Sequence, residues 1–511
     1  MTILSFSFVF LCLGLLIIYY IIPKSYRWII LLLGSIIFYY LSSKNLIIFI
    51  FFSILIIYLI GLSLTKYNEK ISALKNSNKS DDEVKNIKVI LKTKKRKVVL
   101  IGLVLNILCL IITKYSGFII ENVNALFKTN LSFKILLPLG ISYYTLEAIS
   151  YIVDIYRGKY KGEKNPFKVA LYLLYFPKII EGPISKFNEL GKEFLNKKLD
   201  FNNIIVGMDL IIFGLFKKMV IADRAGIFVN QVFSGAMGGI TSIVAMILYT
   251  VQIYAEFSGC IDIVRGISLL FGVRLPVNFK RPFFSKCIQE FWTRWHISLG
   301  AWIREYVFFP VSLSKMNTKV NKLAKEKCST YWYKFIIVAF PLLFVWLVNG
   351  IWHGASYKYV LYGMYYYIVM MIGLMLKPLM DKLAKKVKVN DKILFFGQII
   401  RTCFLVVIGM TLFRATSLSE FGVFIASIFK NGNGLLNQGL IRIDFIILIV
   451  SNLFILLVSI LEENKKINLE KGFTKSPLIR AVFYTILICA IIIFGIYGEG
   501  YDATSFIYGA F

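Results

Sequence analysis

Only two of the 511 residues are histidines, His296 and His353. A catalytic zinc site usually takes three protein ligands, and no cluster of other ligands accompanies either histidine, so we expect no bound metal. The scarcity also singles out the two imidazoles, because neutral imidazole is the side chain best suited to exchange a proton near pH 7.

Cysteine is also sparse, and its seven residues are scattered without a CxxC or any other ligand spacing. They indicate neither a disulfide framework nor a zinc site. The sequence further lacks a Walker A loop, a GxSxG elbow and a GxGxxG motif between a strand and a helix. ATPase, soluble serine hydrolase and dinucleotide chemistry therefore have no support, and no bound cofactor is expected.

Acidic residues are few: 28 Asp and Glu stand against 59 Lys and Arg, a formal charge of +31. The positive-inside rule and attraction to anionic membrane lipids explain most of this imbalance. A basic cytoplasmic face would also attract an anionic acyl donor, such as acetyl-coenzyme A or a carrier protein with a phosphopantetheine thioester. No basic stretch carries a nucleic-acid-binding module, so no nucleic-acid partner is expected.

Long apolar runs are what the sequence has in abundance, with 58% hydrophobic residues and a mean hydropathy of +0.71. Runs long enough to cross a ~30 Å hydrocarbon layer recur from end to end. We therefore predict one all-α, polytopic membrane domain over residues 1–511, with about 11 transmembrane helices plus short re-entrant helices. The first run, residues 3–22, lacks a cleavage signal and is expected to be a retained span.

The charged segments between the runs predict the topology. Residues 65–97 form a predicted basic cytoplasmic loop, because they end in the run Lys92–Lys97. Counting back from this loop places the amino terminus outside the cell. A second basic loop, at 315–327, precedes the last five predicted spans, near 334–352, 357–377, 393–412, 442–461 and 480–497.

The predicted catalytic core covers residues 167–355. Between 167 and 310 the apolar pieces are shorter and are interrupted by prolines, glycines and charges. Such backbone at membrane depth is tolerated only where protein buries it or where it lines a cavity. We therefore expect the cavity in this stretch.

Paired charges surround the first histidine. Glu290 and Arg294 are four residues apart, and Asp262 and Arg265 are three apart, so each pair would share a helix face. Intramembrane charges mark a functional site by default, although ion pairs that hold short helices together would look the same. Trp292, Trp295 and Trp302 fit either a binding site or an interfacial aromatic belt. A structural role for His296 also remains open.

The second histidine follows an apolar run, in the sequence Asn349-Gly-Ile-Trp-His353-Gly354. On a helix, Asn349 would lie one turn before His353 on the same face and could orient its ring. Gly350 and Gly354 would leave space for a ligand to approach. We predict that His353 is the general base that acts on a hydroxyl or a thiol.

These segments resemble the membrane-bound O-acyltransferase family, specifically its bacterial alginate O-acetyltransferase-like branch, over most of the chain. The segments that carry the resemblance are residues 175–184 (YFPKIIEGPI), 257–262 (FSGCID), 290–300 (EFWTRWHISLG), 349–354 (NGIWHG), 413–415 (FRA) and 506–511 (FIYGAF). Glu181 and the pair Cys260-Ile261 depart from the pattern of many relatives, which suggests a different acceptor or partner specificity.

The resemblance implies a helical bundle around a central tunnel that joins a cytoplasmic donor entrance to an extracellular acceptor side. It implies that His353 is the catalytic histidine and His296 the second important one. The matching segments supply the candidate substrate-binding residues Trp352, Trp295, Trp292, Arg294, Asp262 and Ser258.

The predicted function is transfer of an acyl group, most simply acetyl, from a cytoplasmic thioester to hydroxyls of an extracellular or cell-wall polysaccharide. The resemblance implies a bacterial plasma-membrane location and an SGNH-type extracellular acetyltransferase as partner. Two alternatives stay open: a transporter of polysaccharide or lipid-linked sugar, and an O-acyltransferase that acts on lipid.

Overall fold

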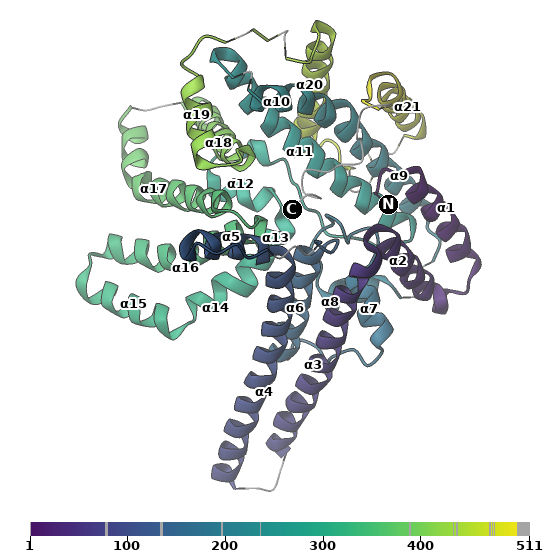
Figure 1. The fold of residues 1–511 in the computed structure, drawn as a ribbon, viewed down its shortest axis with the longest axis vertical. Coiled ribbons are helices and arrows are strands. Elements are labelled where there is room, and N and C mark those ends of the chain that lie inside the picture. Colours follow the sequence, from purple (N-terminus) through teal and green to yellow (C-terminus); the bar gives the residue numbers. More distant parts are fainter. Residues whose placement is uncertain are drawn as a thin grey trace. The chain divides into compact units, whose positions relative to one another are not determined.

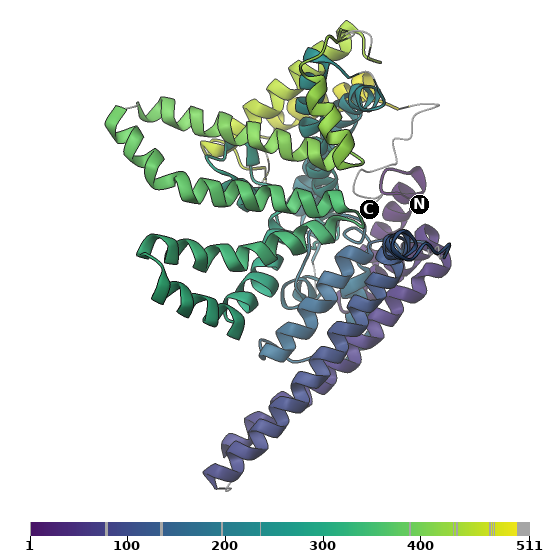
Figure 2. The ribbon, with the colours of Figure 1, turned by 60° about the vertical axis from the view of Figure 1, so that its left-hand side comes forward.

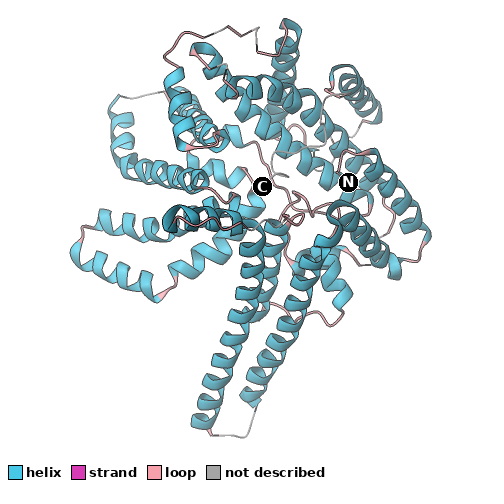
Figure 3. Cartoon of the chain, in the orientation of Figure 1, coloured by secondary structure: helices cyan, strands magenta, loops and turns pink. Residues whose placement is uncertain are grey.

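The computed structural model describes residues 2–497, apart from 77–79, 133–135, 196–197, 236, 388–389, 433, 436–437, 470–471, 473 and 475. Helices and loops make up the described residues, which contain no strand (Figure 3). The predicted all-α fold is confirmed. The carboxy-terminal segment 506–511, which carries part of the resemblance, lies outside the described residues.

Two compact units make up the chain, residues 1–207 with 267–276 and residues 208–266 with 277–511. The single membrane domain predicted for residues 1–511 stays a prediction, and each unit is described by itself. Figure 1 colours the helices along the chain.

The first unit contains the amino-terminal spans. Its helices are α1 (Phe6–Ile21), α2 (Arg27–Ser43), α3 (Ile47–Ala73), α4 (Asp81–Leu110), α5 (Ser116–Phe127), α6 (Ile141–Arg157), α7 (Pro166–Leu174), α8 (Phe187–Glu193) and the start of α9 (Phe201–Leu215). Helices α3 and α4 lie side by side as a long hairpin whose far end extends well beyond α6 (Figures 1 and 2).

This hairpin corrects the predicted loop at 65–97, because α3 continues to Ala73 and α4 already begins at Asp81. Lysine and glutamate are good helix formers, so the charged stretch extends the two helices instead of ending them. A capping box starts α4: the Ser80 hydroxyl accepts a hydrogen bond from the Glu83 backbone N–H, and the Glu83 carboxylate accepts one from the Ser80 N–H.

The second unit contains both histidines. Its helices are the end of α9, α10 (Asp223–Phe233), α11 (Gly239–Leu270), α12 (Ile288–Arg294), α13 (Ile297–Ile303), α14 (Phe309–Ser312), α15 (Lys315–Lys327), α16 (Thr330–His353), α17 (Tyr357–Val387), α18 (Asp391–Arg414), α19 (Leu418–Ser427), α20 (Arg442–Glu463) and α21 (Pro477–Phe494). The predicted loop at 315–327 is wrong, because these residues form α15.

Eight helical segments of the described chain are long and apolar enough to cross a membrane, against the 11 crossings predicted. The first of the eight, Lys24–Ala73, contains two successive helices, α2 and α3. Helix α1 has 16 residues and α6 has 17, so both fall short of the 18 residues that define such a segment. Counting α2 separately from α3 and adding α1 and α6 accounts for the difference of three.

The last five predicted spans match α16, α17, α18, α20 and α21 closely. The interrupted stretch between 167 and 310 holds short helices and two π-helical segments, Phe216–Ala222 and Arg304–Phe308. It also holds α11, a continuous helix of 32 residues that sequence reasoning missed.

Helices α9 and α11 meet at two glycines. A Cβ atom added to Gly214 would lie 2.5 Å from the carbonyl oxygen of Gly259, and one added to Gly259 would lie 2.8 Å from the carbonyl oxygen of Gly214. The two backbones therefore touch without side chains between them. This contact positions the π-helical segment Phe216–Ala222 directly against α11.

Candidate active site

His353 is the last residue of α16, and only 5% of its surface is exposed. Three aromatic rings surround its imidazole: Tyr362 at 5.7 Å, Phe413 at 5.3 Å and Tyr359 at 6.4 Å between ring centroids. The first two meet the imidazole at nearly right angles, 89° and 84°. Helices α16, α17 and α18 thereby hold the ring in a defined orientation.

The two glycines beside His353 have a different role from the one predicted. A Cβ atom on Gly350 would overlap the backbone carbonyl oxygen of Tyr359, and one on Gly354 would overlap the Tyr359 ring. Tyr359 of α17 therefore occupies the space that we assigned to a ligand. The glycines permit close packing of α16 on α17.

Asn349 lies one turn before His353, as predicted, and is 6% exposed. Its side-chain oxygen Oδ1 is buried and accepts no hydrogen bond from any described residue. A bond from the His353 ring to this oxygen is therefore absent here, and the orienting role of Asn349 stays a prediction.

His296 lies at the turn between α12 and α13, where its backbone adopts φ 47° and ψ 52°. This left-handed conformation is unfavourable for a side chain with a Cβ, by about 1–2 kcal/mol, so the surrounding contacts must hold it. Two backbone hydrogen bonds do so: Ile297 N–H donates to the Asn278 carbonyl at 2.9 Å, and Lys280 N–H donates to the Arg294 carbonyl at 2.8 Å.

The side chain of Asn278 completes this turn, and sequence reasoning gave it no role. It is fully buried, and its Oδ1 accepts from the backbone N–H of Ser298 at 2.9 Å and from the Ser298 hydroxyl at 2.8 Å. Because a backbone N–H can only donate, the Asn278 atom at this position is the oxygen. The same oxygen lies 3.3 Å from His296 Nδ1.

These contacts define the tautomer of His296. Since Asn278 Oδ1 can only accept, His296 Nδ1 carries the proton, and the lone pair lies on Nε2. Burial lowers the pKa of His296, which lies outside the candidate spans, to about 3. The ring is therefore neutral at pH 7, and its weak basicity suits positioning better than proton abstraction.

Trp352 brings the two histidines together. Its ring centroid is 5.0 Å from that of His353 and 5.9 Å from that of His296. The two histidines are far apart in sequence, yet both contact the same indole. Trp352 is itself 7% exposed, so the three rings form one buried cluster.

Two cavities flank the His296 turn. One, of about 340 Å³, is lined by His296, Asn349, Trp292, Trp295 and several apolar side chains. The other, of about 800 Å³, is more polar. Its lining includes Lys217, Ser258, Asp262, Arg265, Asn278, Lys280, Arg281, Glu462 and Lys465. Both linings include Thr293 and Ile297, so the α12–α13 turn lies between the cavities.

The predicted binding residues line different cavities. Trp292, Trp295 and Asn349 share a cavity with His296, whereas Ser258 and Asp262 line the larger one. The Lys217 ammonium donates to the Ser258 hydroxyl at 3.0 Å and forms an ion pair with Asp262. Lys217 is a further residue that sequence reasoning missed, because only the fold brings it to α11.

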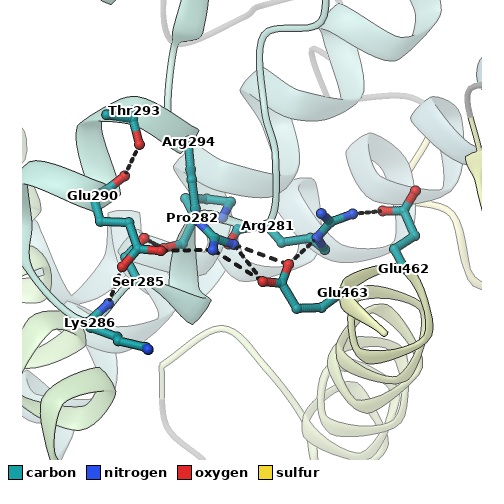
Figure 4. Close-up of polar contacts among 9 residues, drawn as sticks. All are labelled: Arg281, Pro282, Ser285, Lys286, Glu290, Thr293, Arg294, Glu462 and Glu463. Atoms are coloured by element: carbon teal, nitrogen blue, oxygen red, sulfur yellow. Dashed lines mark hydrogen bonds and ion pairs between the residues drawn. The ribbon is translucent and has the colours of Figure 1, made fainter. Parts of the chain in front are cut away.

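Arg294 belongs to a network of ion pairs (Figure 4). Its guanidinium contacts Glu290 at 2.8 Å and Glu463 at 3.1 Å, and Arg281 contacts Glu463 at 2.6 Å and Glu462 at 3.5 Å. The predicted pairing of Glu290 with Arg294 is confirmed. The network ties α12 to the end of α20, while a substrate-binding role for Arg294 stays a prediction.

Within the described part of the chain, no group of three His, Cys, Asp or Glu side chains could hold a metal ion. The chemistry that the described site can perform is acid–base chemistry in a buried, aromatic environment.

Comparison with known proteins bears on this arrangement. The model of the membrane-bound O-acyltransferase family matches residues 162–333, which contain the turn at His296 and the residues of α11 that line the larger cavity. The chain is also 31% identical over 350 residues to the probable alginate O-acetylase of Pseudomonas syringae pv. tomato, covering 66% of this chain and 62% of that protein. These matches make the chain similar to the membrane-bound O-acyltransferase family.

Other similar proteins are named for different acceptors. The chain is 30% identical to the peptidoglycan O-acetyltransferase of Helicobacter pylori, over 54% of this chain and 55% of that protein. It is 29% identical to the teichoic acid D-alanyltransferase of Bacillus subtilis, over 45% of this chain and 58% of that protein. The chain thus matches less than two thirds of the length of these curated relatives, all of which are named as transferases or acetylases.

Proposed function

We propose that this protein is an O-acyltransferase of the bacterial plasma membrane that acts on an extracellular or cell-wall polysaccharide. The acyl group, most simply acetyl, comes from a cytoplasmic thioester. The observation that carries the proposal is the contact of both histidines with the Trp352 ring, together with the cavity of about 340 Å³ that His296 lines. The relatives named for alginate and peptidoglycan support the class of acceptor.

In the proposed reaction, His353 removes the proton of the acceptor hydroxyl as the hydroxyl oxygen attacks the thioester carbonyl. The tetrahedral intermediate then collapses, the carbon–sulfur bond breaks and the thiolate leaves with a proton from the imidazolium. His296 is the positioning residue, since its ring is neutral and fixed by Asn278. The aromatic rings around His353 limit water, which would otherwise hydrolyse the thioester.

The larger cavity is the proposed chamber for the thioester donor. Its basic side chains include Lys280, Arg281 and Lys465, which would attract phosphate groups of coenzyme A or of phosphopantetheine. The neighbouring cavity of about 340 Å³, with Trp292 and Trp295, is the proposed place of the acyl group and of the reacting hydroxyl. An SGNH-type extracellular acetyltransferase is the proposed partner that completes delivery to the polymer.

The test is the O-acetyl content of surface polysaccharide in cells that express wild type, His353→Ala or His296→Ala, with the partner genes present. We expect His353→Ala to abolish acetylation at matched membrane levels, and His296→Ala to reduce it strongly. Lys322→Ala on the exposed face of α15 is the control and should keep wild-type acetylation.

The other two functions predict different results in the same cells. A transporter needs no general base, so unchanged acetylation with less exported polymer in His353→Ala would replace our proposal. Lipid acylation would place labelled acetate in the organic extract instead of the polymer.

A further inference from the structure

The cavity of about 340 Å³ beside His296 is lined by buried polar groups whose hydrogen bonds are incomplete. Trp346 and Asn349 of α16 line it, and their spacing of three residues places them on one face of the helix. Trp346 is 3% exposed and Asn349 6%, yet the Trp346 indole nitrogen and Asn349 Oδ1 have no hydrogen-bond partner among the described residues. A buried polar group left unpaired is unfavourable, so these two atoms indicate a ligand, or water in its place.

Helix α12 contributes two further groups of the same kind to this cavity. The Trp292 indole nitrogen is buried and has no hydrogen-bond partner in the part of the chain that the structure describes. Gln289 also lines the cavity, and its carboxamide forms no hydrogen bond with a described residue. Two carboxamides and two indole N–H groups, from two helices, are therefore available to one ligand.

The indole rings of the lining are held in place by other aromatic rings. Trp346 stacks on Tyr366 with ring centroids 5.3 Å apart at 23°, and Trp292 meets Trp346 at 5.2 Å and 72°. Trp295 stacks on Phe291 at 5.5 Å and 21°. Because these contacts restrict the rotamers of the indoles, the cavity has its shape before a ligand binds, and little side-chain entropy is lost on binding.

The types of polar group in the lining select the chemistry of the ligand. An acyl chain has no O–H or N–H group, so it cannot donate to Asn349 Oδ1. A hydroxyl group both donates and accepts, so a molecule with several hydroxyls can complete the carboxamides and the indole N–H groups together. The indole faces carry partial negative charge and attract the C–H groups of a saturated ring. The lining therefore fits a ring that carries several hydroxyls, which is a sugar.

Charge and volume define the sugar further. Arg304 is the one charged side chain among the described residues that line this cavity, and it is exposed. The larger cavity, by contrast, has several charged residues in its lining. A volume of about 340 Å³ is near the lower end of the roughly 300–1,000 Å³ that is typical of small-molecule sites. The cavity thus admits one neutral ring rather than a run of several.

We propose that this cavity binds one neutral sugar unit of the acceptor. Its hydroxyls bond to Trp346, Asn349 and Gln289, and its ring C–H groups lie against the indole faces. The proposal rests on the polysaccharide acceptor proposed above, and it assigns recognition of the sugar to this chain itself. Because a single unit fits, the acceptor enters as a chain end or as a single sugar, with its hydroxyls beside His296.

The test is titration calorimetry of the full-length protein in nanodiscs with the methyl glycosides of glucose, mannose and N-acetylglucosamine. We expect Asn349→Leu, which loses two hydrogen bonds, to bind the best of these glycosides about 5- to 50-fold more weakly than wild type. Trp346→Phe loses one hydrogen bond and should bind it about 2- to 10-fold more weakly. The matched control is Trp332→Phe on the same helix, because Trp332 is 45% exposed and lies outside the cavity lining; its Kd should stay within about twofold.

Thermal unfolding without sugar separates a binding role of Asn349 from a structural one. Leucine has the branched shape of asparagine without its polar atoms. Asn349→Leu therefore removes an unpaired buried group, and the variant should unfold at the wild-type temperature or above it. A structural Asn349 would make the same variant less stable, and that result would contradict the proposal.

Three binding results would overturn the proposal: no binding of any of the three glycosides to wild type, unchanged binding by Asn349→Leu, or equal weakening by Trp332→Phe. Methyl glucuronide adds a carboxylate to the glucose ring and should bind more weakly than methyl glucoside, since the cavity would desolvate its charge. Tighter binding of the glucuronide would overturn the neutral ligand and assign the cavity to an acidic sugar paired with Arg304.

His353→Ala distinguishes this proposal from the function on which it rests. His353 lies outside the lining of the cavity, so the variant should bind the glycoside within about twofold of wild type. If His353→Ala retains acetyl transfer, the proposed general base is wrong whether or not the sugar binds. If it loses acetyl transfer and wild type binds no glycoside, the function stands and the sugar site is wrong.

Discussion

Replacing Asn278 by alanine tests whether the His296 turn is held by a single side chain. The change removes the oxygen that accepts from the Ser298 N–H and hydroxyl and that lies beside His296 Nδ1. Each buried donor left without an acceptor is unfavourable by about 1–3 kcal/mol. The hydroxyl of Ser298 can rotate to another acceptor, but its backbone N–H cannot.

We therefore expect Asn278→Ala to lower the free energy of unfolding by about 2–6 kcal/mol, because the Ser298 N–H and the His296 Nδ1–H would each lose their acceptor. The left-handed backbone at His296 should then relax, because the contacts that hold it are weakened. A displacement of about 1 Å in a catalytic group reduces turnover by about 100-fold, which is the loss we expect in acetyl transfer.

The assay pairs thermal unfolding in detergent with acetyl transfer to polysaccharide, for Asn278→Ala, Asn278→Asp and Ser298→Ala. Asn278→Asp keeps the acceptor oxygen and should retain the turn, while Ser298→Ala removes one hydroxyl and should be destabilising by only about 1 kcal/mol. The reasoning is refuted if Asn278→Ala unfolds at the wild-type temperature with wild-type activity. A loss of stability without loss of activity would limit Asn278 to a structural role.

Three further predictions concern packing, pH and charge. Gly350→Ala should destabilise the protein by about 1–3 kcal/mol, because the added Cβ would overlap a backbone carbonyl oxygen of α17. Gly373 has open space around it, so Gly373→Ala should not destabilise the protein. Thermal unfolding of the two variants checks both expectations. The pKa of His296 is about 3 in the folded protein and about 6.5 in an unfolded chain, so its contribution to stability is present above pH 6.5 and is lost as the pH falls toward 3. Thermal unfolding between pH 7 and pH 5 should therefore show a steeper loss for wild type than for His296→Gln. Arg294→Gln and Glu463→Gln should be coupled by about 1 kcal/mol in a double-mutant cycle of unfolding, and additive effects would contradict the ion pair of Figure 4.

Hydropathy predicted the last five spans, since apolar length is a local property of the sequence, but it missed α11 and ended the span of α17 ten residues early. The same reasoning missed the charged end of α3 and the charged start of α4, because charge was taken as a sign of a loop although lysine-rich segments are good helix formers. It also assigned Gly350 and Gly354 to a ligand, whereas the neighbour that needs their small size is Tyr359 of the next helix.

The candidate site, too, could be predicted only in part from the sequence. The residue types and neighbours of His296 and His353 predicted acid–base chemistry. The contact of both rings with Trp352 was not predicted, because it depends on the packing of helices distant in sequence. Sequence reasoning gave Asn278 no role because it lies in a loop before α12, and its hydrogen-bond partners depend on the backbone turn at His296. Lys217 escaped notice because its partners, Ser258 and Asp262, belong to α11.

The glycine contact between α9 and α11 has a consequence for how homologous chains can differ. Since Gly214 and Gly259 let two backbones touch, they determine how far the Lys217 ammonium reaches toward Asp262. A methyl group at either glycine would separate the helices, and a chain with such a change would keep the ion pair only with a longer acid opposite the lysine. The presence of glycine at these positions and the length of the acidic side chain should therefore vary together in evolution, because both affect the width of the larger cavity.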